Sequence, residues 1–336
     1  MNNRSSRRVL AGDIGGTKTR LAVVDVEGNV LHTQVEKTYS SREHASLRAI
    51  VQDFTRQHEY QVEGACFGIA GPVHDNIAQA TNLPWRIDAR ELGEYFDVGP
   101  VFLINDLEAN AWGIPALKPE DLFELHAGAG EASGNGAIIA AGTGLGEAGM
   151  YFDGKELRPF ATEGGHADFS PCGDLEIELL RFLLKKHQHV SWERILAGPG
   201  LVNIHEFLRN HRKMASPNWL VEEMARGDPA AAISRAAQEQ TDRVCEEALE
   251  MFVSLYGAEA GNLALKHMAT GGIYIGGGIA PKILTWLRKG DFMHAFLDKG
   301  RMRPLLESMP VRVILNDRTA LYGPAIYAAR SIHDSR

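Results

Sequence analysis

Short apolar runs of strand length alternate with glycine-rich turns from the beginning of the chain. The pattern predicts buried strands at 9–11 and 19–25. The turn between them contains an acid, two adjacent glycines and a threonine: Asp13, Gly15, Gly16 and Thr17. A tight Gly-Gly turn exposes backbone N–H groups that can bind a phosphate, and an acid at its mouth suits a hydrated Mg²⁺. A plain hairpin turn is the alternative.

The first third of the chain continues as mixed strand and helix. A strand is predicted at 29–35, and Ser40 to Glu43 match a capping box that would open a helix. The apolar residues of that helix recur at helical spacing: Leu47, Ile50, Val51 and Phe54. Further strands are predicted at 65–70 and 101–104, the second ending at Asn105 and Asp106. This succession is typical of an α/β layer.

The opening pattern of strand, glycine turn and strand then occurs again. A strand at 137–140 leads into Gly142, Thr143 and Gly144, and a returning strand follows at 147–152. The repeat indicates an internal duplication, with two α/β domains that each offer a phosphate-binding hairpin to a shared cleft. The same glycines also fit the dinucleotide pattern G-x-G-x-x-G, but that motif must open a helix, and a strand follows here.

The last half of the chain is mainly helical. Helices are predicted at 175–187, 192–208, 238–265 and 319–332, with a strand at 311–315. A third glycine turn follows a strand at 271–275, and its lack of side chains leaves room for a flat ring: Gly276, Gly277 and Gly278.

Composition excludes several classes of protein. The net charge of −8 argues against nucleic acid or an acidic membrane as the main partner. The three cysteines, Cys66, Cys172 and Cys245, have no spacing for a disulfide framework or a zinc knuckle. With no apolar run of membrane-spanning length, we expect a soluble, cytoplasmic protein.

Six motifs together resemble those of bacterial ATP-dependent glucokinases, members of the actin-like sugar kinase superfamily. They occur in the order of that family: GDIGGTKTR (12–20), LINDLEA (103–109), AAGTGLGEA (140–148), EGGHADFSP (163–171), SWERILAGPGLVN (191–203) and GGIYIGGGIAP (271–281). The resemblance implies a two-domain actin-like ATPase (ribonuclease H-like) α/β fold with a central cleft. It implies a small domain of 1–115 plus 318–336, a large domain of 116–317, and a homodimer.

The resemblance also implies roles for individual residues in phosphorylating the 6-hydroxyl of glucose, the first step of glycolysis. Asp106 is the expected catalytic base, and the sugar-binding residues are Asn105, Glu163, His166 and Glu193. ATP and Mg²⁺ are the expected cofactors, with the phosphates and adenosine at the three glycine turns and Asp13 near the metal. A positioned carboxylate that accepts the hydroxyl proton suits this chemistry, because phosphoryl transfer needs mainly positioning and charge stabilisation.

Some residues have simpler explanations when considered alone. Asp106 could cap the helix that follows it, Glu193 could be an acid in the first turn of a helix capped by Ser191, and His166 could be structural. The alternatives for the whole chain are a kinase for fructose, mannose or an amino sugar, a hexose sensor without turnover, and a structural ATPase of the actin type. Only Cys172 stands where related sugar kinases carry a Cys-x-Cys-Gly zinc motif, so we expect no zinc site.

Overall fold

The computed structural model describes residues 6–334 except 59 and 131. The chain divides into two compact units, which we describe separately. Unit 1 consists of Met1–Asp121, Arg158–Ala161 and Asn316–Arg336, and unit 2 consists of Leu122–Leu157 and Thr162–Leu315.

Unit 1 is built on a five-stranded sheet. Its strands are, in spatial order, β3 (Val30–Ser40), β2 (Lys18–Glu27), β1 (Arg7–Ile14), β4 (Ala65–Ile69) and β8 (Val101–Asn105). The hairpin partners β1 and β2 are antiparallel, whereas β1, β4 and β8 run parallel. A small three-stranded sheet is formed by β5 (Val73–His74), β6 (Ile77–Gln79) and β7 (Arg86–Asp88). The predicted strands of this region are thus confirmed.

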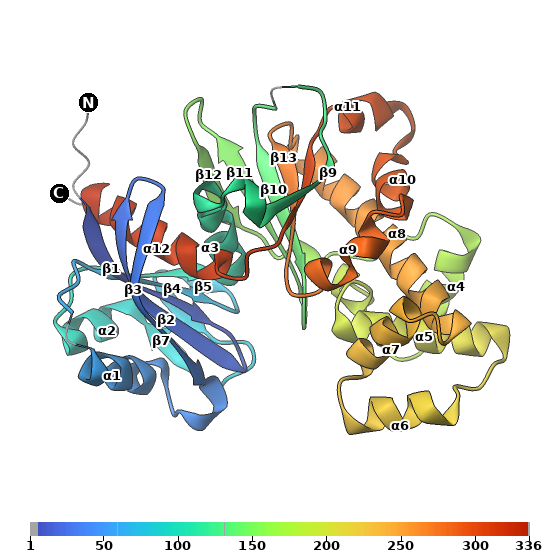
Figure 1. Ribbon diagram of the computed structural model, residues 1–336, viewed down its shortest axis with the longest axis horizontal. Helices are drawn as coiled ribbons and strands as arrows, with labels where there is room; N and C mark the ends of the chain where they lie inside the picture. Colours follow the sequence, from blue (N-terminus) through green and yellow to red (C-terminus); the bar gives the residue numbers. More distant parts are fainter. Residues whose placement is uncertain (1–5, 59, 131, 335–336) are drawn as a thin grey trace. The chain divides into compact units, whose positions relative to one another are not determined.

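Helices cover both faces of this sheet (Figure 1). On one face α1 (Leu47–Gln57) and α2 (Ala89–Phe96) pack over a core that includes Phe54, Phe67 and Leu92. On the other face α3 (Asp106–Gly113) and α12 (Thr319–Asp334) enclose a second core. The apolar face predicted for α1 is buried as expected, because its residues recur every three or four positions.

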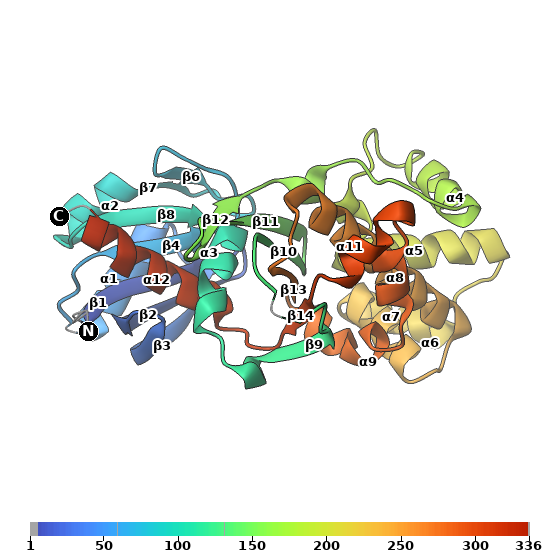
Figure 2. The ribbon, with the colours of Figure 1, turned by 90° about the horizontal axis from the view of Figure 1, so that it is seen from above.

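The C-terminal helix completes unit 1 (Figure 2). It packs against β1, β2 and β4 and lies against α3. At the crossing with α3 the two backbones approach closely, since a Cβ at Gly323 would overlap the carbonyl oxygen of Ala109. Glycine therefore sets the distance between these two helices.

The capping box predicted at Ser40–Glu43 is wrong. Ser41–Glu43 form only a single 3₁₀ turn, and α1 begins at Leu47, where the Ser46 hydroxyl accepts a hydrogen bond from Ala49 N at 3.2 Å. The Ser41 side chain is buried and donates to Gly15 O at 2.8 Å. Because this serine binds the first glycine turn, it belongs to the turn and not to a helix start.

The second sheet repeats the strand order of the first. Its order is β12 (Leu157–Ala161), β11 (Leu145–Phe152), β10 (Gly136–Ala141), β13 (Gly272–Gly276), β14 (Val311–Ile314) and β9 (Leu122–His126). Apart from the edge strand β9, the third, second, first, fourth and fifth strands of each repeat lie side by side in that order. The internal duplication predicted from the sequence is therefore confirmed at the level of topology.

Unit 2 carries most of the helices: α4 (Asp174–Leu183), α5 (Gly198–Arg212), α6 (Asn218–Arg226), α7 (Pro229–Gln238), α8 (Arg243–His267), α9 (Leu284–Leu287), α10 (Asp291–Leu297) and α11 (Arg303–Glu307). The 25-residue α8 is the central helix, and α5, α7 and α10 pack around it. Its apolar face joins the largest core of the molecule.

Two predicted helix boundaries in unit 2 are wrong. The helix expected at 192–208 is a 3₁₀ turn at Trp192–Arg194 followed by α5, which begins at Gly198 with proline in its first turn, where a missing N–H costs nothing. The helix expected at 238–265 begins at Arg243, because the Asp242 carboxylate caps it by accepting from Cys245 N at 2.9 Å.

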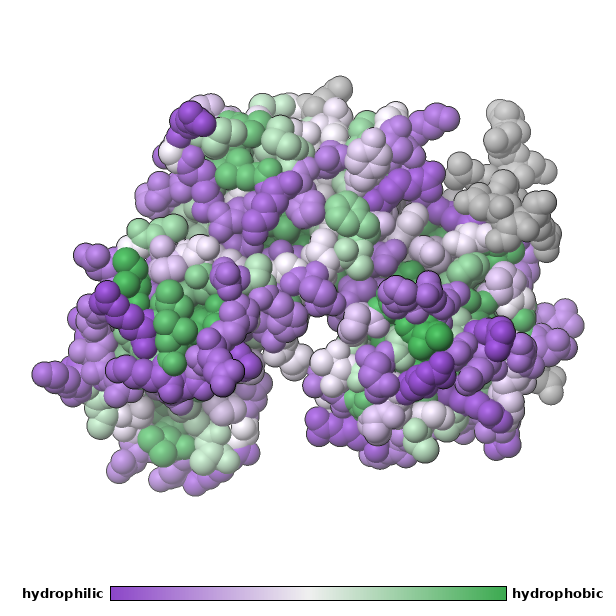
Figure 3. Space-filling model, turned by 180° about the vertical axis from the view of Figure 1, so that it is seen from behind, coloured by the Kyte–Doolittle hydropathy of each residue, from purple (hydrophilic) through white to green (hydrophobic). Residues whose placement is uncertain are grey.

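Apolar patches alternate with polar residues over the face shown in Figure 3. Within the part of the chain that the structure describes, none of the helices combines the length and apolarity needed to cross a membrane. All three cysteines are free, Cys66 and Cys245 buried and Cys172 exposed.

Candidate active site

The candidate site residues of unit 1 lie at one edge of its sheet. Ile14 of β1 is paired with Ile69 of β4, which is paired in turn with Asn105 of β8. The carboxyl ends of these three parallel strands therefore lie in register, with Asp13 at one of them and Asp106 directly after another. In α/β proteins this edge is where ligands bind.

Asn105, not Asp106, is the N-cap of α3. The Oδ1 atom of Asn105 accepts from Leu107 N at 2.9 Å and from Glu108 N at 3.3 Å, and its Nδ2 atom donates to Gly71 O at 3.3 Å. The capping role considered for Asp106 thus belongs to its neighbour. Asp106 is the first residue of the helix and half-buried, with Oδ1 2.9 Å from Leu107 N.

The first glycine turn is held by one backbone hydrogen bond within the turn and one from the segment at Ser41. Gly15 N donates to Lys18 O at 2.9 Å, and Ser41 N donates to Thr17 O at 2.9 Å. A Cβ at Gly16 would lie 2.6 Å from the Cβ of Asn82, so a second segment packs directly against the turn. These contacts hold the backbone of the predicted phosphate-binding turn in one conformation.

The Asp13 carboxyl at the mouth of this turn is half-buried. Burial raises its pKa to about 6, although the positive charge of Arg20 opposes this shift. Arg20 itself is paired with Asp317, its NH2 atom lying 3.2 Å from Oδ2. A carboxyl group that loses its proton near pH 6 is an oxygen ligand of the kind that Mg²⁺ prefers.

The second and third glycine turns lie next to each other in unit 2. Gly142 N donates to Gly144 O at 2.8 Å, which closes the second turn. Gly277 has φ +81°, and a Cβ there would overlap Ala141 O, so only glycine suits this position. Ile279 N donates to the same carbonyl at 3.2 Å. The structure thus brings together Gly142, Thr143 and Gly144 with Gly276, Gly277 and Gly278.

The buried hydroxyl of Tyr256 fixes the strand ends that carry these two turns. It accepts from Ala141 N at 3.2 Å and lies 3.3 Å from Ile139 O and 3.4 Å from Gly276 O. Burial raises the pKa of this phenol, so the hydroxyl stays neutral.

The three predicted sugar-binding residues of unit 2 lie on two adjoining 3₁₀ turns. Glu163 and His166 are exposed on the turn Gly164–His166, and Glu193 is in the turn Trp192–Arg194. Trp192 N donates to Ala167 O at 3.0 Å and so joins the two turns.

Glu193 also contacts the second glycine turn. Its Oε2 atom accepts from Leu145 N at 3.1 Å, and a Cβ at Gly144 would lie 2.5 Å from the same oxygen. The helix-start explanation for Glu193 has no support, because Ser191 makes no side-chain cap and the turn does not continue as a helix. Glu193 thus lies between the turn that carries Glu163 and a glycine turn.

Sequence reasoning missed Glu147, which follows the second glycine turn on β11. This acid is 2 % exposed, and burial together with the charge of Glu259 raises its pKa to about 8. In the sequence Glu147 is a lone acid within an otherwise apolar strand. Because a buried acid is rare unless it has a specific role or partner, this position is the signal that could have identified it.

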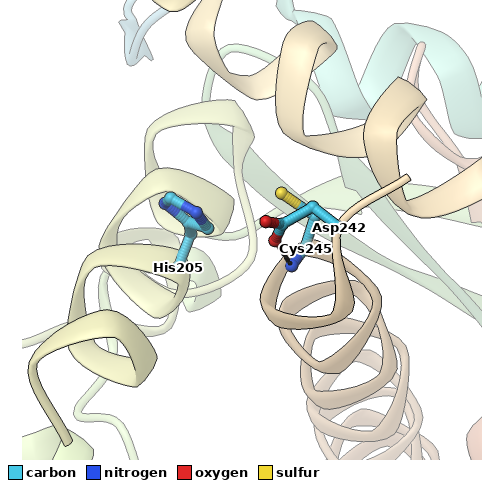
Figure 4. A group of neighbouring side chains, drawn as sticks. All are labelled: His205, Asp242 and Cys245. Carbon is cyan, nitrogen blue, oxygen red and sulfur yellow. Dashed lines mark hydrogen bonds between the residues drawn. The ribbon is translucent and has the colours of Figure 1, made fainter. Parts of the chain in front are cut away.

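One group of side chains in unit 2 has the composition of a metal site: His205 on α5, and Asp242 and Cys245 at the start of α8 (Figure 4). Arg209, however, already binds two of these residues, with Nε 3.2 Å from His205 Nε2 and NH2 2.6 Å from Asp242 Oδ1. Burial lowers the pKa of His205 to about 4 and raises that of Cys245 to about 12, so both are neutral. The guanidinium of Arg209 occupies the place that a metal cation would take. Together the four side chains join α5 to α8.

The fold is that of actin-like ATPases, and glucokinases and ROK sugar kinases are among the solved structures that match. A crystal structure of glucokinase from an Antarctic psychrotroph has a TM-score of 0.84 and 30% identity, covering 98% of this chain and 99% of that one. A glucokinase of the ROK family from Streptomyces griseus, solved with glucose and AMPPNP, has a TM-score of 0.65 and 25% identity, covering 96% and 99%. The chain therefore shares its fold with sugar kinases.

Sequence comparison defines the family. The model of the glucokinase family matches residues 10–331. The glucokinase of Trichormus variabilis is 45% identical over 96% of this chain and 99% of its own, and that of Synechocystis sp. is 44% identical over 96% and 98%. The chain belongs to the glucokinase family and is an enzyme, as the six motifs indicated.

Proposed function

We propose that this enzyme transfers the γ-phosphoryl group of ATP to the 6-hydroxyl of glucose, with Asp106 as the general base. The observation that carries the role of Asp106 is the position of its carboxylate at the carboxyl edge of β1, β4 and β8, with the capping of α3 left to Asn105. In that position the carboxylate is held by a rigid element and can orient the attacking hydroxyl and accept its proton.

We assign Glu163, His166 and Glu193 to the glucose hydroxyls. Carboxylates and an imidazole pair with hydroxyls that both donate and accept, and a sugar that lacks one of them would leave a polar group unpaired. The hydrogen bonds that join their two turns to the second glycine turn support a common role. Asn105 is assigned to glucose through the second N–H of its amide group, because its Oδ1 atom caps α3 and its first N–H donates to Gly71 O. We propose that the small domain consists of 1–115 plus 318–336 and the large domain of 116–317.

We assign the nucleotide to the three glycine turns. The turn at Gly15, Gly16 and Thr17 and that at Gly142, Thr143 and Gly144 offer backbone N–H groups to the phosphates. The turn at Gly276, Gly277 and Gly278 has the open surface that suits the adenosine. Mg²⁺, when bound, would supply positive charge that neutralises the phosphates. Asp13 would hold this ion through water.

The raised pKa of Asp13 predicts a loss of activity in acid. Because its carboxyl group is protonated below about pH 6, we expect kcat/KM for MgATP at pH 5 to be about tenfold lower than at pH 8. Asp13→Asn should lower kcat/KM at pH 8 and remove this acid limb. Asp25→Asn, on the same sheet and paired with Arg8, should keep it. An unchanged acid limb in Asp13→Asn would assign the titration to another group.

The experiment that tests the proposed function is ADP formation from MgATP with glucose, fructose, mannose and N-acetylglucosamine in parallel. We expect glucose to exceed the other sugars by tenfold or more in kcat/KM, about 1.4 kcal/mol of transition-state binding. Preference for another sugar would make the chain a kinase for that hexose. If none of the sugars raised ADP formation above the blank, the assignment as a kinase of these sugars would be rejected.

We infer that the enzyme works in the cytoplasm as a homodimer and has neither nucleic acid nor a membrane as partner. The net charge of −8 supports the second inference, because phosphate backbones and acidic lipids repel such a surface. The dimer is inferred from the family, and a solution mass of twice 36.8 kDa would support it.

A further inference from the structure

Glu147 lies beneath the turn that carries Glu163 and His166. A Cβ at Gly164 would overlap Oε2 of Glu147 and lie 2.9 Å from its Cδ. In addition, Thr162 Oγ1, just before the turn, donates to the backbone oxygen of Glu147 at 2.9 Å. The backbone of the turn therefore rests directly on the carboxyl group of Glu147.

The same carboxyl group meets a second acid from α8. Burial and the charge of Glu259, which is itself completely buried, raise the pKa of Glu147. Two neighbouring carboxyl groups repel each other when both are ionised, so one of a buried pair keeps its proton. Asn262 Nδ2 donates to Glu259 Oε2 at 2.8 Å and Lys266 Nζ lies 3.3 Å from Glu259 Oε1. These donors favour the charge on Glu259 and leave the proton with Glu147.

The other charged and titratable groups near the pair do not replace this proton. Lys266 lowers the pKa of both acids, and Lys299 lowers that of Glu259, while burial raises both. Tyr256, on the same helix, is neutral. Oε1 of Glu147 is buried and has no hydrogen-bond partner within the part of the chain that the structure describes. A negative charge on Glu147 would therefore be uncompensated at this oxygen, and the group depends on its proton to remain buried.

We propose that Glu147 is a positioning residue for glucose: its neutral carboxyl group, packed against Gly164, supports the turn that presents Glu163 and His166 to the sugar. This rests on the proposed function, in which those two residues bind glucose. Loss of the proton places two negative charges side by side in the core, and the repulsion moves the carboxyl group that Gly164 rests on. Glucose then binds less well, whereas the phosphate turns are less affected.

The test compares the pH dependence of KM for glucose in the wild-type enzyme and in Glu147→Gln. In the wild type the pair loses its proton near pH 8, so KM should be about tenfold higher at pH 9 than at pH 7. Glutamine has nearly the same shape and stays neutral at any pH. In Glu147→Gln KM should therefore stay near the wild-type value of pH 7 throughout this range.

Two further variants complete the design. Glu147→Ala removes the support and should raise KM at pH 7 with a smaller change in kcat, measured on protein that is shown to be folded by circular dichroism. Glu250→Gln, also on α8 but 39% exposed at its side chain, should keep the alkaline rise of the wild type. The proposal is overturned if Glu147→Gln retains that rise, or if the wild type shows no rise. Turnover of glucose by the wild type at pH 7 tests the proposed function separately.

Discussion

Asp106→Asn should lower kcat for glucose by two to four orders of magnitude while glucose still binds. General-base catalysis contributes about 10²- to 10⁴-fold, and asparagine keeps the shape of the side chain but cannot accept the hydroxyl proton. The start of α3 should survive because Asn105 provides its cap. The measurements are steady-state kinetics coupled to glucose 6-phosphate and a calorimetric titration with glucose.

A matched control is available in the same unit. Asp88 is the N-cap of α2, with Oδ1 accepting from Arg90 N at 3.1 Å and from Glu91 N at 3.4 Å. Asparagine caps helices about as well as aspartate, so Asp88→Asn should leave kcat unchanged. If Asp106→Asn also kept kcat within threefold of the wild type, Asp106 would not be the base.

Gly323→Ala should strongly destabilise unit 1. The added methyl group would overlap Ala109 O and lie 2.7 Å from Ala109 C and 3.0 Å from Gly113 N. All three are backbone atoms of α3, so the clash is relieved only by moving the two helices apart and opening the core between them. We expect the free energy of unfolding to fall by about 3 kcal/mol. The measurement is the midpoint of urea unfolding, monitored by circular dichroism and tryptophan fluorescence.

Gly93→Ala is the control for this substitution. Gly93 also lies within a helix of unit 1, but a Cβ there would meet only ordinary contacts, the nearest being Val101 Cγ2 at 3.4 Å. Because alanine favours a helix by about 1 kcal/mol over glycine, this variant should be neutral or stabilised. Equal urea midpoints for the two variants would show that α3 and α12 can separate at little cost.

Local patterns predicted most of the architecture. The short apolar runs between glycine turns correspond to β1, β2, β10 and β11, because a buried strand leaves a continuous apolar run and its turn requires glycine. The repetition of that pattern predicted the duplicated sheet. The edge strand β9 and the short helices α9–α11 were not predicted, and neither were β5–β7, β12, α2, α6 and α7. Most of these elements are short, so their apolar residues are too few to show a period.

The errors occurred where distant residues decide the local structure. Ser41 matches a capping box, but its hydroxyl binds Gly15 O, 26 residues away in the chain. Trp192–Arg194 was predicted as part of a helix, but it forms a 3₁₀ turn in which Trp192 N donates to Ala167 O. A local pattern carries no information about such partners, so helix starts are its weakest predictions.

The candidate residues were found mainly through the motifs, whereas their grouping required the structure. Glu193 and Leu145 are 48 positions apart in the chain, yet they share a hydrogen bond. Glu147 was missed because the sequence does not show which residues surround an acid inside an apolar strand. In the structure Gly164 packs against it and Glu259 affects its pKa. Asp106 was placed correctly after its strand, but the identity of the cap depended on side-chain directions that the sequence does not give.

The packing of α12 has a consequence for how the protein is made. Unit 1 begins with β1, but its second core also needs Leu321, Ala325 and Ile326 from α12. A ribosome delivers these residues only after all of unit 2 has been synthesised. One apolar face of the unit 1 sheet therefore stays uncovered until α12 has been made. Unit 2, in contrast, can fold from a nearly continuous segment. During translation, unit 1 is the part of the nascent chain that most needs protection from aggregation.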